Sequence, residues 1–160
     1  MIYKEITADV TKMIPEYVSA HCISNDCAMG AGVVLAFRKV FPGLKEACKA
    51  YMKSPVWNNE NKMPVPYRHQ DMPGVIYNMF TKDKFWLKAG KGIDYEDYLN
   101  NLKLSLKAVK QMMYDNGETK LAMPKIGSGL DRCKWEDVRC IIYDVFQETD
   151  FEILICSIQD

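Results

Sequence analysis

Two glycine-rich stretches of this sequence contain residues that can take part in ligand chemistry. The first, NDCAMGAG, covers residues 25–32, and the second, IGSGLD, covers residues 126–131. Glycines let backbone N–H groups approach a ligand closely, and a following helix adds its dipole, so loops of this kind suit phosphate oxygens. Either loop alone can equally be a plain turn. Two of them at equivalent strand ends favour an anion-binding site.

Neither stretch matches the common nucleotide fingerprints. Starting from Gly30, the dinucleotide motif G-x-G-x-x-G requires glycine at position 35, where Leu35 stands, and G-x-x-x-x-G-K-[ST] does not occur. An ordinary NAD site and a P-loop are therefore both disfavoured.

Cysteine and histidine give little support to other chemistries. The six cysteines include no C-x-x-C pair and only two histidines are present, so we expect no metal site and no cofactor. Cys22 beside His21 is a poor catalytic pair, because adjacent strand residues point to opposite faces. Thiols scattered through apolar segments indicate buried side chains in a reducing compartment.

Length and charge point to one domain with a local site. The 160 residues are 48% hydrophobic and carry 21 basic and 21 acidic side chains, so we expect a single domain over residues 1–160 without a broad cationic field for nucleic acid. The N-terminus lacks the pattern of a signal peptide, and no apolar run is long enough to span a membrane. We expect a cytoplasmic protein that does not insert into a membrane.

The elements that must position the loops alternate along the chain. Periodicity predicts strands at 2–7, 17–23, 74–81, 119–123 and 151–158, and helices at 33–41, 44–53, 95–116 and 135–148. Residues 54–73 are predicted to form a long connection with at most a short strand at 63–67. This alternation is typical of an α/β fold with a largely parallel sheet covered on both faces, which binds ligands at the carboxyl ends of its strands.

The stretch HCISNDCAMGAGVVLAFRKVFPG, residues 21–43, together with MPKIGSGLDRCKWEDV, residues 123–138, resembles the macrodomain family. The similarity is to the branch of the terminal ADP-ribose protein glycohydrolases, and it extends from ITADVT to the last strand. It implies a three-layer α/β/α fold with a mixed, largely parallel central sheet. It also implies that the glycine loops surround the distal ribose and the diphosphate of ADP-ribose.

The resemblance also implies individual ligand-binding residues. Asp9 matches the acidic position that hydrogen-bonds the adenine amino group, although the same residue can be a simple turn residue, and Val10 would frame the base. Ser24 would line the distal-ribose pocket. Where the branch has an aromatic side chain near the adenine, this chain has Ile158, a weaker apolar contact. The two loops would contribute Met29, Gly30, Ala31 and Gly32, and Gly127, Ser128, Gly129 and Leu130.

The resemblance further implies two catalytic residues, Lys82 and Asp131. Lys84 lies two residues beyond Lys82, so it is the alternative lysine, and Lys82 can also be an ordinary surface lysine. Cleavage at an anomeric carbon requires a nucleophile or a stabiliser of an oxocarbenium-like centre, and a group that moves protons. A partly neutral lysine can form a covalent adduct with that carbon.

Two classes of function follow. As an enzyme, the protein would remove mono-ADP-ribose from acidic side chains, with ADP-ribose 1″-phosphate and O-acetyl-ADP-ribose as alternative substrates. As a reader, it would bind ADP-ribose without cleaving it. The expected partners are ADP-ribose or ADP-ribosylated protein, with ADP-ribosylated nucleic acid as a further possibility, and we expect a monomer.

Overall fold

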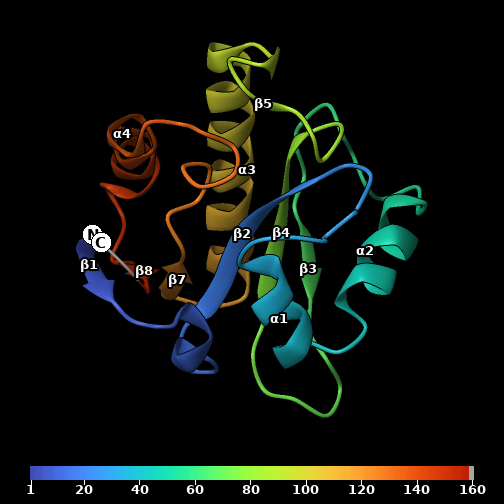
Figure 1. The fold of residues 1–160 in the computed structure, drawn as a ribbon. Coiled ribbons are helices and arrows are strands. Elements are labelled where there is room, and N and C mark those ends of the chain that lie inside the picture. The colour runs from blue at the N-terminus through green and yellow to red at the C-terminus, as the bar shows by residue number, and fades with distance from the viewer. Residues whose placement is uncertain (159–160) are drawn as a thin grey trace.

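The computed structural model describes residues 1–158, and six strands among them form one mixed sheet (Figure 1). The order across the sheet is β1-β8-β7-β2-β4-β3, and β5 and β6 pair separately. The strands are β1 (Ile2–Thr7), β2 (Val18–Ser24), β3 (Val65–Tyr67), β4 (Ile76–Lys82), β5 (Lys88–Ala89), β6 (Gly92–Ile93), β7 (Lys120–Met123) and β8 (Glu152–Ser157).

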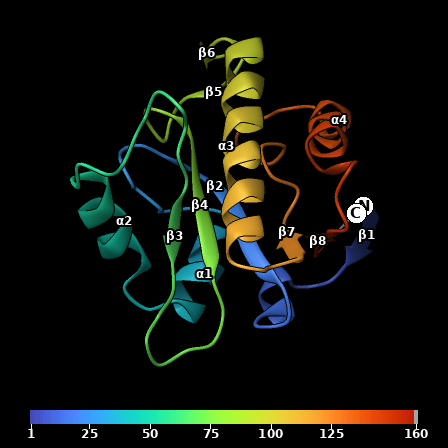
Figure 2. The same ribbon diagram turned by 180° about the vertical axis from the view of Figure 1, so that it is seen from behind.

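Helices cover both faces of this sheet, which makes three layers. They are the short 3-10 helix η1 (Val10–Met13) and the α-helices α1 (Val34–Val40), α2 (Leu44–Met52), α3 (Tyr95–Asp115) and α4 (Trp135–Phe146). Helix α1 lies on the face seen in Figure 1, and α3 crosses the opposite face, which Figure 2 shows. The predicted α/β/α architecture is therefore correct.

The sheet is parallel except at one edge. Pairings β1–β8, β8–β7, β7–β2 and β2–β4 are parallel, whereas β3 runs antiparallel to β4, with Val65 opposite Asn78. Every residue of β4 is buried, as expected for a strand covered on both faces. Because five strands share one direction, their carboxyl ends lie along one edge of the molecule.

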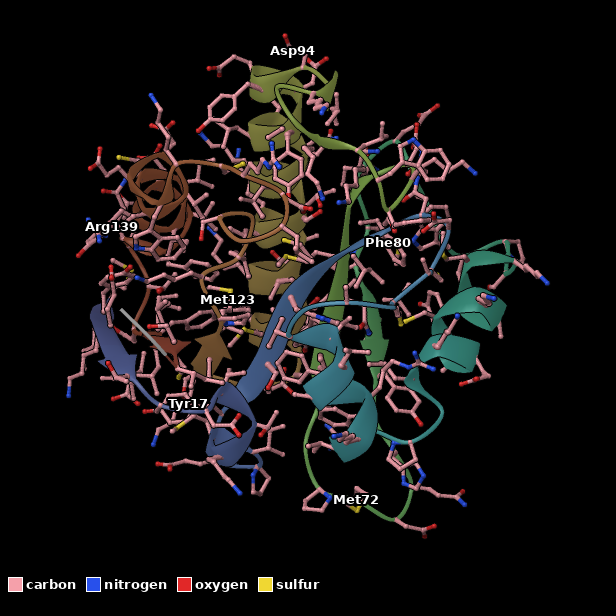
Figure 3. All side chains as sticks on the ribbon, in the orientation of Figure 1. Tyr17, Met72, Phe80, Asp94, Met123 and Arg139 are labelled. Carbon is pink, nitrogen blue, oxygen red and sulfur yellow. The ribbon has the colours of Figure 1, made fainter. Side chains whose placement is uncertain are left out.

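Apolar side chains on the two faces form two cores. Leu102, Phe146 and Met123 belong to the core beneath α3 and α4, whereas Phe37 and Phe80 belong to the core beneath α1 and α2. Figure 3 labels Met123 and Phe80, one from each core. Alternation along the strands divides the apolar residues in this way, so the sheet is held from both sides.

Helix α3 shows how local sequence sets an element that positions the site. Asp94, labelled in Figure 3, caps its N-terminus by accepting a hydrogen bond from the Asp97 N–H at 3.1 Å. Gly117, with φ of 72°, follows its end. Residues at spacings of three and four are fully buried along it, namely Tyr98, Leu102, Leu106, Val109 and Met113.

The structure differs from the predicted elements mainly in short pieces. The longer predicted helices and strands are all present, with ends that move by one or two residues. Helix η1 was not predicted, because four residues are too few to show a period. The two-residue strands β5 and β6 were not predicted for the same reason. The long connection before β4 contains β3, as expected.

Candidate functional site

The predicted site residues gather at the carboxyl edge of the sheet. Asp9 follows β1, Ser24 and Lys82 are the last residues of β2 and β4, residues 126–131 follow β7, and Ile158 follows β8. Parallel strands bring these positions to one edge although they are far apart in the sequence. The position of each is therefore a consequence of topology.

Lys82 is buried and forms an ion pair with Asp131. Its Nζ contacts Oδ1 of that carboxylate and donates to the carbonyl oxygens of Phe85 at 3.0 Å and Leu87 at 2.9 Å. The side chains of the pair are only 7% and 13% exposed. Lys84, the alternative lysine, is exposed to solvent. The structure thus brings together the two predicted catalytic residues and leaves the alternative lysine outside.

The other oxygen of the Asp131 carboxylate has a partner that the sequence did not indicate. The hydroxyl of Tyr98, on α3, donates to Oδ2 of Asp131, and Thr81 Oγ1 donates to the Tyr98 oxygen at 3.1 Å. Tyr98 fits the apolar spacing of α3, so the sequence suggested only a core residue.

Removing either Lys82 or Asp131 from their buried ion pair would cost about 3–5 kcal/mol, because it leaves the charge of the other residue uncompensated.

The first glycine loop is held in place by Asp26. The Asp26 carboxylate accepts hydrogen bonds from Ser24 Oγ at 2.5 Å, from the Ala28 N–H at 3.2 Å and from the Phe85 N–H at 3.0 Å. Burial opposes the charge of Asp26, but these hydrogen bonds outweigh it and lower the pKa of the carboxyl. Asp26 therefore joins this loop to the segment that follows Lys82, which sequence reasoning did not anticipate.

Cations from the neighbouring helices hold the outer side of the same loop. Arg38 Nη1 donates to the Met29 carbonyl at 3.0 Å, and Lys45 Nζ donates to the Ala28 carbonyl at 3.2 Å. Met29 has φ of 48°, a left-handed conformation that is uncommon for a residue with a side chain. The three following residues, Gly30, Ala31 and Gly32, are exposed. The loop thus combines a fixed base with an accessible glycine-rich tip.

The second glycine loop packs closely on Tyr98 and on the first loop. A Cβ at Gly127, where φ is 72°, would lie 3.3 Å from the Tyr98 ring, and a Cβ at Gly32 would lie 3.2 Å from Leu130 Cδ1. Ser128 Oγ donates to the Lys125 carbonyl at 2.8 Å. Gly129 faces open space. The two predicted loops therefore meet, with the Lys82–Asp131 pair beside the second.

The predicted ribose and adenine residues have mixed environments. Ser24 is buried, with its hydroxyl directed to Asp26. Asp9 Oδ1 caps η1 by accepting from the Thr11 N–H at 2.9 Å and from its hydroxyl at 2.7 Å, and these hydrogen bonds lower the pKa of Asp9. Val10 is buried in the α1–α2 core, and Ile158 is 75% exposed. Their contacts with a ligand stay predictions.

The rival pair Cys22 and His21 is separated by the sheet. The His21 ring packs on Phe37, with centroids 4.9 Å apart, and its Nε2 lies 2.5 Å from Asn78 Oδ1. Cys22 packs instead against the core beneath α3. Burial raises the pKa of the Cys22 thiol, and the Asp131 charge raises it further. The pair cannot act as a thiolate and base, as strand alternation predicted.

Other features of the described chain lie elsewhere. Surface hollows of about 460 and 410 Å³ lie at the amino ends of the strands, next to Phe151 and Tyr77 respectively, and include none of the predicted site residues.

Within residues 1–158, no group of three or more His, Cys, Asp or Glu side chains is placed so that it could hold a metal ion. Across the same residues, every helix is too short or too polar to cross a membrane.

Comparison with known proteins identifies relatives of this chain. No protein family model matches the chain. Human ADP-ribose glycohydrolase OARD1 is 37% identical over 139 residues, which are 87% of this chain and 80% of the human protein.

Many solved structures share the fold. The macrodomain of Mycobacterium tuberculosis DarG has a TM-score of 0.78 at 18% identity, covering 98% of this chain and 97% of that one. Thermosipho africanus DarTG, solved in complex with ADP-ribose, has a TM-score of 0.75 at 14% identity, covering 98% of this chain and 42% of that one.

Proposed function

Because this chain belongs to the macrodomain family of ADP-ribose glycohydrolases and is an ADP-ribosyl hydrolase, we propose that it removes mono-ADP-ribose from acidic side chains. The bond cleaved would be the ester between the anomeric carbon of the distal ribose and a glutamate or aspartate carboxylate. The observation that carries this proposal is the buried Lys82–Asp131 pair beside the meeting point of the two glycine loops.

The loops would bind the ligand and leave its distal ribose at the pair. The exposed glycine-rich tips of residues 30–32 and 129–130 would accommodate the diphosphate and the distal ribose. Asp9 would accept a hydrogen bond from the adenine amino group through Oδ2, which accepts no hydrogen bond from residues 1–158. Ile158 would offer its exposed apolar side chain to the base.

Lys82 is the proposed nucleophile. Its Nζ must first lose a proton, and Asp131 is the base in contact with it. The Nζ electron pair then forms a bond to the anomeric carbon, while the bond from that carbon to the ester oxygen breaks and its electrons leave with the acceptor. Asp131 passes its proton toward the leaving group. Water finally displaces the lysine and releases ADP-ribose.

Related substrates fit the same chemistry. ADP-ribose 1″-phosphate and O-acetyl-ADP-ribose carry different leaving groups on the distal ribose. In ADP-ribosylated nucleic acid, the leaving group is a nucleobase. A reader that only binds ADP-ribose requires neither Lys82 nor Asp131, and their burial as an ion pair supports an enzyme. We further propose that the protein acts as a cytoplasmic monomer.

Parallel assays test this proposal. Wild-type protein is incubated with glutamate-linked ADP-ribosyl protein, ADP-ribose 1″-phosphate, O-acetyl-ADP-ribose and ADP-ribosylated DNA, and the released product is quantified. We expect the glutamate ester to be cleaved with the highest kcat/KM. Tight binding of ADP-ribose without cleavage of any substrate would favour the reader instead.

The two lysines provide a matched pair of variants. Lys82→Ala should abolish turnover and leave ADP-ribose affinity within several-fold, because the lysine serves the transition state more than the ground state. Lys84→Ala should retain activity, because its side chain is exposed. Full activity in Lys82→Ala would remove the covalent route and leave a direct attack by water.

A further inference from the structure

Tyr98 contacts the proposed catalytic pair without occupying the ligand site. It is fully buried on α3, and its hydroxyl donates to Oδ2 of Asp131, whereas Lys82 contacts Oδ1. Thr81 Oγ1 donates to the Tyr98 oxygen at 3.1 Å. Because Thr81 supplies the proton of that hydrogen bond, the single Tyr98 proton is directed to Asp131.

We propose that Tyr98 is a positioning residue, which keeps the Asp131 carboxylate ionised and oriented with Oδ1 toward Nζ of Lys82. This inference rests on the function proposed above. A carboxylate with a separate donor on each oxygen cannot rotate about its Cβ–Cγ bond without losing one of the two hydrogen bonds. The Tyr98 ring also packs closely on Gly127, since a Cβ there would lie 3.3 Å from ring atom Cε1.

Few other groups around Asp131 can compensate the negative charge of its carboxylate. Cys22 on β2 and Cys133, two residues beyond the second loop, face the same carboxylate. Burial, followed by the Asp131 charge, raises the pKa of both thiols, that of Cys133 to about 12. Neither thiol therefore carries charge near neutral pH. Lys82 on β4 and Tyr98 on α3 are the partners that stabilise the carboxylate.

Tyr98 remains a hydrogen-bond donor throughout the working range of pH. Burial raises the pKa of its phenol well above the ordinary value, and the nearby Cys22 and Asp131 raise it further. Because Tyr98 donates to Oδ2, Oδ1 of Asp131 can take the proton from Nζ and release it to the leaving group with no bond to Tyr98 broken or formed.

Replacement of Tyr98 by Phe removes this hydrogen bond and keeps the ring. We expect kcat for the glutamate ester to fall about tenfold. The acidic limb of the pH profile of kcat should move up by about one pH unit, because a hydrogen bond to a charged group favours ionisation by that amount. KM should stay within about twofold. Tyr95→Phe is the matched control, because the Tyr95 hydroxyl donates to Asp137 at 2.6 Å one turn earlier on α3.

The control should leave the pH profile where it is in the wild type. If Tyr98→Phe moves KM or lowers the melting temperature but leaves the acidic limb in place, Tyr98 is only a packing residue and the inference is wrong.

A measurement without substrate separates this inference from the proposed function. Crystal structures of wild type, Tyr98→Phe and Tyr95→Phe are compared. In Tyr98→Phe the Asp131 carboxylate should rotate away from Nζ of Lys82, because Oδ2 has lost its donor, and in Tyr95→Phe it should stay in place. An unchanged carboxylate in Tyr98→Phe overturns the positioning role even if the enzyme cleaves the ester. A rotated carboxylate with no cleavage by wild-type protein overturns the proposed reaction alone.

Discussion

Lys82 and Lys84 differ completely in environment although they are two residues apart. In a continuing strand, both would lie on the same face. Strand β4 ends at Lys82, however, and the chain turns so that its next carbonyls, from Phe85 and Leu87, accept hydrogen bonds from Nζ. The sequence could not choose between the lysines, because the choice depends on where the strand ends.

Asp9 caps η1 in addition to its proposed contact with adenine, and one substitution separates the two. Asp9→Asn keeps a good cap for η1, because the amide oxygen can still accept from Thr11. Its NH₂ group would then face the adenine amino group, where the carboxylate offered an acceptor. We expect ADP-ribose binding to weaken by about 1–3 kcal/mol, measured by calorimetry, with the melting temperature of the free protein unchanged. An unaltered dissociation constant would leave Asp9 only its capping role.

Helix α3 was predictable as an element, but its contact with Asp131 was not. Its position was predicted from the periodicity of the sequence, and the structure confirms it. The hydrogen bond from Tyr98 to Asp131 could not be predicted in this way, because Asp131 lies 33 residues away and the spacing of α3 treats tyrosine as an apolar residue. The two loops were predictable as a site because glycine patterns are local, but the contact between Gly32 and Leu130 is not.

The packing of α3 can be tested with two leucines on opposite faces. Leu102 is fully buried, whereas Leu104 is 43% exposed. Leu102→Ala should lower the free energy of unfolding by about 2–5 kcal/mol, because it removes buried surface and leaves a cavity. Leu104→Ala should change it by less than about 0.5 kcal/mol. Denaturant unfolding measures both, and equal losses would mean that α3 is packed differently.

At the scale of the whole molecule, the buried His21 is an uncharged side chain packed on the core beneath α1 and α2. Burial lowers the pKa of His21 to about 4, against a weaker opposing effect of its hydrogen bond to Asn78. Between the ordinary histidine pKa of about 6.5 and this value, the unfolded chain binds a proton that the folded protein does not. The free energy of unfolding therefore falls as the pH is lowered through this interval.

A comparison with His21→Gln isolates this contribution, because the Gln amide can still donate to Asn78. Between pH 7 and pH 4, wild-type protein should lose about 3 kcal/mol more stability than the variant, measured by urea unfolding at several pH values. Parallel curves for the two proteins would show that His21 titrates normally.

The parallel topology is what turns scattered residues into a site. It brings the ends of β2, β4 and β7 together, and with them Ser24, Lys82 and the loop that contains Asp131. The alternation of elements predicted this arrangement in outline. The ion pair itself required the three-dimensional fold, because 49 residues separate its two members.

The central claim is that Lys82 forms a covalent bond to the distal ribose, and intact-protein mass spectrometry of Asp131→Asn tests it most directly. With glutamate-linked ADP-ribosyl protein, this variant should gain the mass of one ADP-ribosyl group. A buried lysine without its counter-ion favours the neutral, nucleophilic form, so the adduct can form, whereas its release lacks the proton-transfer residue. Adding Lys84→Ala should leave the gain in place, and adding Lys82→Ala should abolish it. A gain that persists without Lys82, or full turnover by Asp131→Asn with no adduct, would contradict the account.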